Sequence, residues 1–314
     1  MRCPTLSELP QPPSGRSGWP HTDESPQLPD SAPNGKPWPK ISIVTPSYNQ
    51  GQFIEETMRS VLLQGYPNLE YIIIDGGSGD ESLRIIREYE NTLAYWVSEP
   101  DRGQAHAINK GFQRATGEIF GWINSDDFYY PGVFEVMARA FEEHPEIALV
   151  HGYEHHVDIS GNIMRDVFPV LKDARAATLY VGKPLLQLTC FWRSRAHRAV
   201  GGLDETLKNH MDYDFLLKLS YYYPSTYIPF RVGAFRRYPD QQSQMIEQWF
   251  SEHRKVRKRF LAQLNISPVR YYGLCCWYRG LALWRDRRSS GLVRTLANQL
   301  RCKATLTRGN QPQG

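Results

Sequence analysis

Two adjacent carboxylates, Asp126 and Asp127, stand in the stretch GWINSDDFYYPG. The residues before them, EIFGWI at 118–123, have the short, bulky and apolar composition of a buried strand. Acids at the carboxyl end of a parallel strand lie where ligands bind to open sheets, and they can hold a divalent cation on phosphate oxygens. The alternative is that Asp126 caps a helix that Pro131 helps to begin.

Three other apolar segments also end in polar residues. ISIVT (41–45) is followed by PSYNQGQ, YIII (71–74) by DGGSGD, and AYWVS (94–98) by EPDRGQ. The carboxyl ends of parallel strands meet at one edge of a sheet, so we expect the four loops to form one site.

Two of these loops have side chains suited to a nucleotide. Asp75 can accept hydrogen bonds from a nucleobase or ribose, and the glycines after it allow a ligand to approach the backbone closely. The alternative is a glycine-rich turn in which Asp80 caps the next helix. Arg102, Lys110 and the amides at Gly103 can hold a diphosphate, since cations and helix N-termini both favour anions. Lys110 can equally be an exposed helix lysine.

The surrounding elements predict an α/β fold. Apolar strands alternate with segments of helical spacing from residue 41 to residue 152, which indicates a mostly parallel sheet flanked by helices. The pattern then loosens, and DISGN (158–162) is typical of a turn between two strands. We therefore expect the second half of the sheet to be mixed. The predicted helices cover residues 53–64, 81–89, 103–115 and 134–143.

Composition excludes several classes of protein. The 314 residues are 41% hydrophobic and 22% charged, with a net charge of +4, so a globular domain is expected and general nucleic-acid binding is not. The five cysteines have no CxxC spacing, which fits a reducing cytoplasmic setting. Residues 1–39 are rich in Pro, Ser and Gly and lack a signal sequence, which predicts a disordered tail. No segment approaches the about 20 apolar residues of a membrane-spanning helix.

Longer segments resemble a known family. ISIVTPSYNQGQFIEETMRSVLLQGYPNLEYIIIDGGSGDES, SEPDRGQAHAINKGFQRATGEIFGWINSDDFYYPG and GGLDETLKNHMDYDFLLKLS together are similar to the nucleotide-sugar glycosyltransferases of family 2, over roughly Ile41 to Ser243. The resemblance implies a GT-A fold, a nucleotide-diphosphate sugar as donor, Mg²⁺ or Mn²⁺ as cofactor, and inversion of the anomeric centre.

The resemblance also implies which residues contact the donor. The residues that would line the nucleotide pocket or approach the ribose, diphosphate or sugar are Thr45, Pro46, Tyr48, Asp75, Asp101, Gly103, Gln104, Asn109 and Lys110. The family's D-x-D motif reads Asn124-Ser125-Asp126 here, so a neutral amide stands in place of the first aspartate. Asn124 and Ser125 would line the donor, and Asp126 with the additional acid Asp127 would hold the metal.

An inverting transfer needs a general base that takes the proton of the acceptor hydroxyl. The family's acidic pair reads Met211-Asp212, so the resemblance makes Asp212 the candidate base, and the alternative is that Asp212 caps the following helix. Asp214 is expected to support the structure. The segment RRYPDQQSQ is expected to close over the diphosphate, with Arg236 among its contacts. It lacks the Q-x-x-R-W signature of processive enzymes, which predicts addition of one sugar at a time.

The last part of the chain combines cations with aromatic residues, in EHRKVRKRF and RYYGLCCWYRGLALWRDRR. Such segments can lie at an anionic membrane surface, here the inner face of the plasma membrane, or can pack as helices on the main domain. We predict a tail over 1–39, a GT-A domain over 40–245, and a basic, aromatic helical extension over 246–314. The division within the domain falls at 150, between a nucleotide-sugar half (40–150) and an acceptor half (151–245).

The predicted function is an inverting glycosyltransferase that moves a sugar from a nucleotide-diphosphate sugar to a saccharide or lipid-linked saccharide. A UDP-sugar is the favoured donor, and synthesis of a surface polysaccharide is the expected process. One alternative is a nucleotidyltransferase that makes nucleotide-sugars, although the glycine-rich loop with Arg and Lys that is usual near its first strand is missing. The other is a non-catalytic module that binds nucleotide-sugar or membrane.

Overall fold

The structure is a computed structural model that describes residues 1–239, 241, 246–264 and 266–287. It forms two compact units, residues 1–264 and 265–314. In the second unit the described element is helix α8 (Pro268–Arg287). The boundary lies later than the predicted one after residue 245, because helix α7 (Ile246–Gln263) belongs to the first unit and buries Val256 and Phe260.

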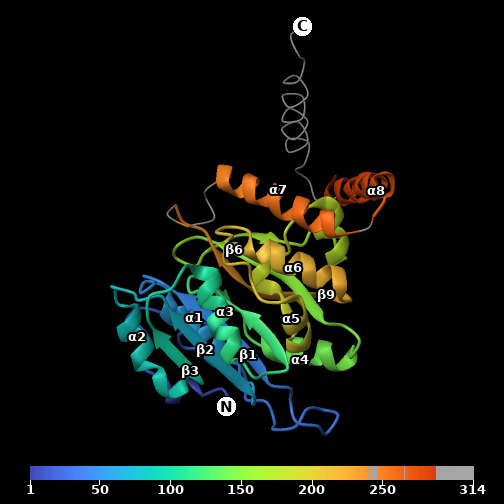
Figure 1. The fold of residues 1–314 in the computed structure, drawn as a ribbon. Coiled ribbons are helices and arrows are strands. Elements are labelled where there is room, and N and C mark those ends of the chain that lie inside the picture. The colour runs from blue at the N-terminus through green and yellow to red at the C-terminus, as the bar shows by residue number, and fades with distance from the viewer. Residues whose placement is uncertain (240, 242–245, 265, 288–314) are drawn as a thin grey trace. The chain divides into compact units, whose positions relative to one another are not determined.

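One mixed sheet organises the first unit (Figure 1). Among the described residues it has nine strands in the order β3-β2-β1-β4-β8-β6-β9-β5, with β7 paired to β6. Their bounds are β1 (Ile41–Ser47), β2 (Leu69–Asp75), β3 (Tyr95–Ser98), β4 (Ile119–Trp122), β5 (Phe128–Tyr129), β6 (Leu149–Val157), β7 (Ile163–Val167), β8 (Phe191–Arg193) and β9 (Ser225–Arg236).

The strand directions confirm the predicted mixed, mostly parallel sheet. Strands β1 to β4 pair in parallel, whereas β8 pairs antiparallel to both β4 and β6. β6 and β7 form a hairpin around the predicted turn at 158–162. The mixed half therefore begins at β8, beside the strand that precedes the acidic pair.

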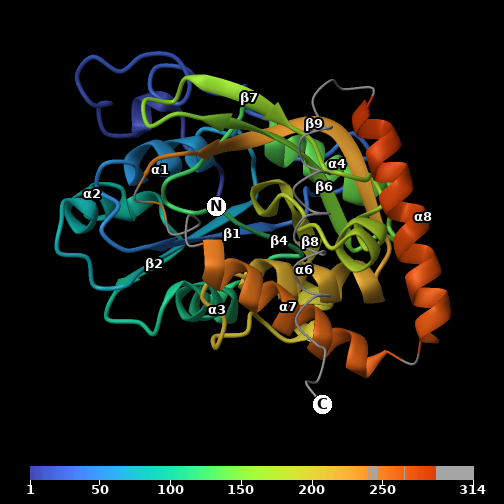
Figure 2. The same ribbon diagram turned by 90° about the horizontal axis from the view of Figure 1, so that it is seen from above.

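Helices cover both faces of the sheet. In Figure 2, α1 and α4 lie on one side of strands β1 and β4, and α3 and α6 lie on the other. Helix bounds are α1 (Ile54–Leu62), α2 (Ser82–Glu88), α3 (Gln104–Arg114), α4 (Val133–Glu143), α5 (Ser194–Val200) and α6 (Met211–Tyr222). Shorter helical segments are η1 (Leu6–Glu8), η2 (Glu90–Thr92), η3 (Ala176–Val181) and η4 (Gln187–Thr189).

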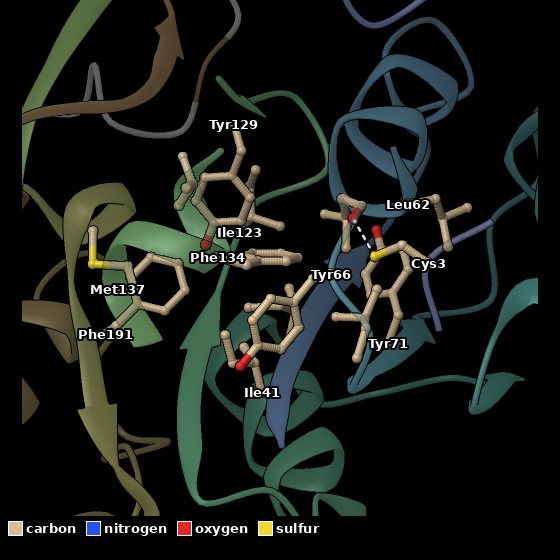
Figure 3. Packing of buried hydrophobic residues seen from close by; sticks show 14 of the residues in the cluster. Cys3, Ile41, Leu62, Tyr66, Tyr71, Ile123, Tyr129, Phe134, Met137 and Phe191 are labelled. Carbon is tan, nitrogen blue, oxygen red and sulfur yellow. Dashed lines mark hydrogen bonds between the residues drawn. The ribbon is translucent and has the colours of Figure 1, made fainter. Parts of the chain in front are cut away.

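The alternation of side chains along β4 divides the core into two parts. Ile119 and Ile123 join the cluster under α1 and α4, in which Tyr66 and Phe134 pack at a ring distance of 6.1 Å (Figure 3). On the other face, Trp122 lies 5.5 Å from the ring of Trp192.

Helix α3 packs very closely on the sheet. A side chain added at Gly111 would meet Val44 Cγ1 at 2.4 Å, so the helix can approach β1 only because this position is a glycine. The close approach fixes the N-terminus of α3 beside the strand ends.

The N-terminal segment is folded, which corrects the prediction of a disordered tail over residues 1–39. Cys3, Leu9 and Trp38 are buried in the main core, and Cys3 lies beside Leu62 in Figure 3. Proline and glycine in this segment reduce regular secondary structure, but its few apolar side chains join the same core cluster as those of α1. Composition alone therefore underestimated its order.

Arg59 on α1 is the anchor of this segment. Its guanidinium is fully buried and donates hydrogen bonds to the carbonyl oxygens of Pro10, Pro20 and His21, at 2.8–3.0 Å, and to the hydroxyl of Tyr89 at 2.9 Å. Charged donors to carbonyl groups are the stronger class of protein hydrogen bond.

Replacing Arg59 with methionine should therefore detach the segment. We expect the free energy of unfolding to fall by about 3 kcal/mol, since several charge-assisted hydrogen bonds are lost and buried carbonyls remain unpaired. Urea denaturation measures the loss, and limited proteolysis should cut within residues 1–39. The matched control Arg87→Met, at an exposed position on α2, should change stability by less than about 0.5 kcal/mol. Equal stability of the two variants would contradict the anchoring role.

Candidate functional site

The four predicted loops meet at one edge of the sheet. The register aligns the ends of three strands, with Ser47 opposite Asp75 and Asp75 opposite Ser98. The first two loops are joined directly, because the amide of Asn49 donates to Ser78 Oγ at 2.8 Å and the Asn49 side chain accepts from the amide of Gly79 at 2.9 Å. These loops therefore form a single wall.

Asp75 holds this wall together from behind. Its two oxygens accept hydrogen bonds from the amides of Gly77 and Ser78, and from the hydroxyls of Ser78 and Ser98, at 2.5–3.1 Å. The side chain is fully buried. Asp80 likewise accepts hydrogen bonds from the amides of Gly51 and Ser82. The structure thus places Asp75 as a support for the loop that a base would contact.

Three other residues face a common space at the strand edge. A side chain at Gly76 would meet Asp101 Oδ2 at 2.7 Å and the ring of Tyr48 at 3.3 Å. Tyr48 is 62% exposed, so its ring is available to a planar ligand. By contrast, Thr45 and Pro46 are buried within β1, and the Thr45 hydroxyl lies 3.0 Å from that of Tyr71. The surface at this point of the strand edge is therefore made by Tyr48, Gly76 and Asp101.

The start of α3 is tied to the acidic loop. Gly103 has a φ of +114°, a conformation that side chains strongly disfavour, and its amide donates to Asp101 Oδ1 at 2.7 Å. Gln104 Nε2 donates to Asn124 Oδ1 at 2.8 Å. The third and fourth loops are thus joined as firmly as the first two.

Asn109 and Lys110 make contacts away from this space. Asn109 Oδ1 accepts from the amide of Leu203, and its Nδ2 donates to the carbonyl of Leu203 and to Glu205, at 2.8–3.1 Å. Lys110 pairs with Glu99. Both residues brace α3 in the structure.

The acidic pair lies where β4 ends, and neither acid caps a helix. Helix α4 begins at Val133 after Gly132, and the amide of Val133 donates to Gln64 Oε1. Ser125, Asp126 and Asp127 are all buried, at 5%, 9% and 1% exposure. This arrangement excludes the capping interpretation of Asp126.

Burial sets the electrostatics of the pair. Burial raises the pKa of Asp126, and a hydrogen bond from Tyr238 opposes that rise. The pKa of Asp127 is raised well above its usual value, first by burial and then by the charge of Asp126. Asp127 Oδ2 has no hydrogen-bond partner among the described residues, and the buried Glu154 adds further negative charge nearby. A cation would relieve this repulsion.

The donor set fits Mg²⁺ or Mn²⁺ held partly by a substrate. The described residues contain no group of three or more His, Cys, Asp or Glu side chains that could hold a metal ion alone. Hard cations of this kind accept one or two carboxylates and take their other ligands from phosphates and water. Asp126 is the more accessible carboxylate, so it would be the direct ligand.

Arg236, at the end of β9, holds the acidic loop in place. Its amide donates to Asp127 Oδ1 and its Nε to the carbonyl of Asp126, both at 2.9 Å, while its guanidinium pairs with Glu56 at 2.8 Å. The side chain is 1% exposed. The expectation that Arg236 contacts a diphosphate is therefore wrong in this structure, because the guanidinium is used inside the protein.

Tyr238 is a site residue that the sequence did not reveal. Its hydroxyl donates to Asp126 Oδ2 at 2.9 Å, and its ring packs on Phe53 at 5.2 Å. No spacing rule connects a tyrosine after β9 with an acid after β4. The only available signal was its place within RRYPDQQSQ, the segment that was expected to close over the donor.

Asp212 lies in the first turn of α6, after His210 rather than at the cap position. Phe215, three residues later on the same side of the helix, packs 6.1 Å from Trp122 at the end of β4. Asp212 therefore lies on the helix that packs against β4. It is half-buried, and burial raises its pKa to about 6.

Asp214 has the structural role that was expected of it. It is buried and pairs with Lys218 and Arg259, both at 2.6 Å. Among the described ion pairs, Asp214 has two cationic partners and Asp212 has none.

Comparison with known proteins assigns the sequence to a family. A family model described as "Glycosyl transferase family 2" matches residues 42–201, just over half of the chain. Chondroitin synthase from Escherichia coli is 28% identical over 240 residues, which cover 74% of this chain and 34% of that protein. An uncharacterized glycosyltransferase of Rickettsia typhi is 29% identical over 187 residues, 57% of this chain and 58% of that protein. The chain thus spans less than two thirds of either relative.

Solved structures confirm the predicted GT-A fold. TarS of S. aureus, residues 1–349 in complex with UDP-GlcNAc, superposes with a TM-score of 0.61 at 17% identity, covering 76% of this chain and 71% of that one. The mannosyltransferase PcManGT of Pyrobaculum calidifontis, in complex with GDP-Man and Mn²⁺, gives a TM-score of 0.56 at 19% identity, with coverage of 89% and 84%.

The unpaired charge of Asp127 predicts a stability gain on its removal. Because its folded pKa is raised, the stabilisation linked to this group is complete below the unfolded pKa and is lost as pH rises through the folded pKa. Asp127→Asn keeps the acceptor for Arg236 and removes the charge. In metal-free buffer at pH 8 we expect the variant to be about 1 kcal/mol more stable than wild type, with the gap closing towards about pH 4.

Chemical denaturation at several pH values measures this gap. The matched variant Asp23→Asn, at an exposed carboxylate, should follow the wild-type curve. A variant that is less stable than wild type at pH 8 would show that Asp127 is a net stabilising charge.

Proposed function

Since the chain belongs to glycosyl transferase family 2 and is a glycosyltransferase, we propose that it transfers one sugar, with inversion, from a UDP-sugar to a saccharide or lipid-linked saccharide acceptor. The observation that carries this proposal is the buried acidic pair at the sheet edge where the four loops meet. Asp126 and Asp127 lie at the end of β4, and Asp212 lies in the first turn of α6, the helix whose Phe215 packs on Trp122 of that strand. The similarity to chondroitin synthase supports synthesis of a surface polysaccharide as the process.

The donor would lie along the edge of the parallel strands. We assign the nucleotide to the surface formed by Tyr48, Gly76 and Asp101, where an exposed ring and a carboxylate oxygen lie close together. The diphosphate would follow towards Gln104 and Asn124, at the N-terminus of α3, whose amides favour phosphate charge. Ser125 would line the same surface. In this arrangement Thr45, Asp75, Asn109 and Lys110 act by supporting the loops.

A bound Mg²⁺ or Mn²⁺ would supply positive charge that stabilises the departing nucleotide diphosphate. Asp126 would hold the ion, and Asp127 would orient the loop through Arg236. Asp126 Oδ2 accepts a hydrogen bond from the Tyr238 hydroxyl, which would orient the carboxylate that holds the ion.

Asp212 would take the proton of the acceptor hydroxyl as that oxygen attacks the anomeric carbon from the face opposite the leaving group. Its pKa of about 6 leaves it mostly ionised at neutral pH, yet basic enough to accept a proton. Burial is the physical cause of this value.

The donor site is tested by calorimetric titration with UDP, GDP and dTDP, each with and without Mn²⁺. We expect UDP to bind in the presence of Mn²⁺, and Asp126→Asn to weaken that binding at least about tenfold, since it removes the charged ligand. The control Asp23→Asn should bind as wild type does. Absence of binding by every nucleotide would overturn the donor site and favour a non-catalytic role.

The base is tested through the pH profile. Asp212→Asn should lower kcat by about 10²- to 10⁴-fold with UDP binding unchanged. In the wild type, kcat/KM should fall as pH decreases through about 6, because the base becomes protonated. Asp214→Asn, which leaves Lys218 and Arg259 without their carboxylate, should instead lower the unfolding midpoint and keep the same profile. A product with the anomeric configuration of the donor, read by NMR, would overturn the inverting mechanism.

A further inference from the structure

Helix α8 exposes an unusual number of large apolar side chains (Figure 1, red). Val269, Tyr272, Trp277 and Trp284 are 83%, 68%, 65% and 56% exposed. Singly exposed apolar residues are common on soluble proteins, but here two tryptophans and a valine, each more than half exposed, stand on one 20-residue helix. Such a surface indicates a binding partner.

The spacing places three of these side chains, those of Val269, Trp277 and Trp284, on one face of the helix. At about 100° per residue, Val269, Cys276, Trp277 and Trp284 fall within an arc of about 100°. The small residues Gly273 and Gly280 lie inside the same arc, whereas the buried residues Cys275 and Ala282 lie on the opposite side. We call the exposed arc the α8 face.

Arginines border the α8 face on both sides. Arg270 lies at one edge and Arg279 at the other, and both are exposed. The described side chains of α8, residues 269–284, include no carboxylate. The whole helix has four arginines, Arg270, Arg279, Arg285 and Arg287, against one carboxylate, Asp286. An apolar centre with a mainly cationic border is complementary to a surface that is apolar inside and anionic outside.

The sequence beyond the helix has the same charge. Residues 288–314 contain no Asp or Glu. Their cations are Arg288, Arg294, Arg301, Lys303 and Arg308. A cluster of cations next to an apolar helix face is typical of segments that bind anionic lipids.

We propose that the α8 face binds the surface of an anionic lipid bilayer, with the helix axis in the membrane plane. Trp277 and Trp284 would lie at the level of the headgroups, where amphipathic rings are favoured, and Arg270 and Arg279 would reach the lipid phosphates. No helix among the described residues is long and apolar enough to cross a membrane, so the contact is peripheral. This inference rests on the proposed function, since it assumes the lipid-linked acceptor that is proposed there.

Sedimentation of the full chain with vesicles tests the proposal. We expect binding to phosphatidylcholine vesicles that contain about one third phosphatidylglycerol, and little binding to pure phosphatidylcholine. Trp277→Ser/Trp284→Ser should reduce the partition coefficient at least about tenfold, because the apolar contact is lost. Arg270→Gln/Arg279→Gln should reduce the preference for anionic lipid. The control Met164→Ser/Phe168→Ser, which removes two residues of similar exposure near β7, should bind as wild type does.

Cys276 offers a second and local measurement. It is exposed on the α8 face, whereas Cys3, Cys190 and Cys275 are buried. In a Cys302→Ser background, an environment-sensitive fluorophore on Cys276 should shift to shorter wavelength with anionic vesicles only. This readout reports insertion of the face itself rather than general adsorption of a basic protein.

Three outcomes distinguish lipid binding by the α8 face from dimerisation and from a failure of the nucleotide site. Vesicle binding that is unchanged in the tryptophan variant, or no vesicle binding, would overturn the α8 face as a lipid site. Concentration-dependent dimerisation that the tryptophan variant abolishes, without vesicle binding, would identify a second copy as the partner instead. UDP titration of the same variants is the independent check, since intact UDP binding beside failed vesicle binding overturns only the membrane proposal.

Discussion

The buried guanidinium of Arg236 is the interaction on which the arrangement of the site depends. It links the end of β9 to the carbonyl of Asp126, while the amide of the same residue binds the carboxylate of Asp127. The positive charge is itself balanced by Glu56 on α1. A helix, the acidic loop and the last strand of the sheet are thus fixed together, although they are far apart in sequence.

The same interaction connects the N-terminal segment to the site. His21, which Arg59 holds through its carbonyl, lies 3.9 Å from Glu56 and is buried. Burial lowers the pKa of His21, so the imidazole is neutral at physiological pH and adds no charge beside Arg236. A segment of proline-rich composition therefore completes the support behind the acidic pair.

The aspartates near the sheet edge and on α6 lie in different environments. Asp126 and Asp127 are adjacent and buried, so each ionised group raises the cost of the other, and the pair favours a cation. Asp212 is separate from them and half-buried, and its pKa near 6 suits proton transfer. Asp214, two residues away, is neutralised by Lys218 and Arg259 and contributes to stability instead.

The sequence by itself determined the α/β alternation, the parallel first half and the loops at the strand ends, because these follow from local periodicity and from the polar residues that end each strand. It also determined the acidic pair as a candidate site. The tertiary structure alone decided which polar residues are left exposed at the strand edge and which are used inside the protein. Asp75 satisfies its own loop, Arg236 is used inside the protein and Tyr238 joins the site, since hydrogen bonds between distant segments leave no trace in local pattern.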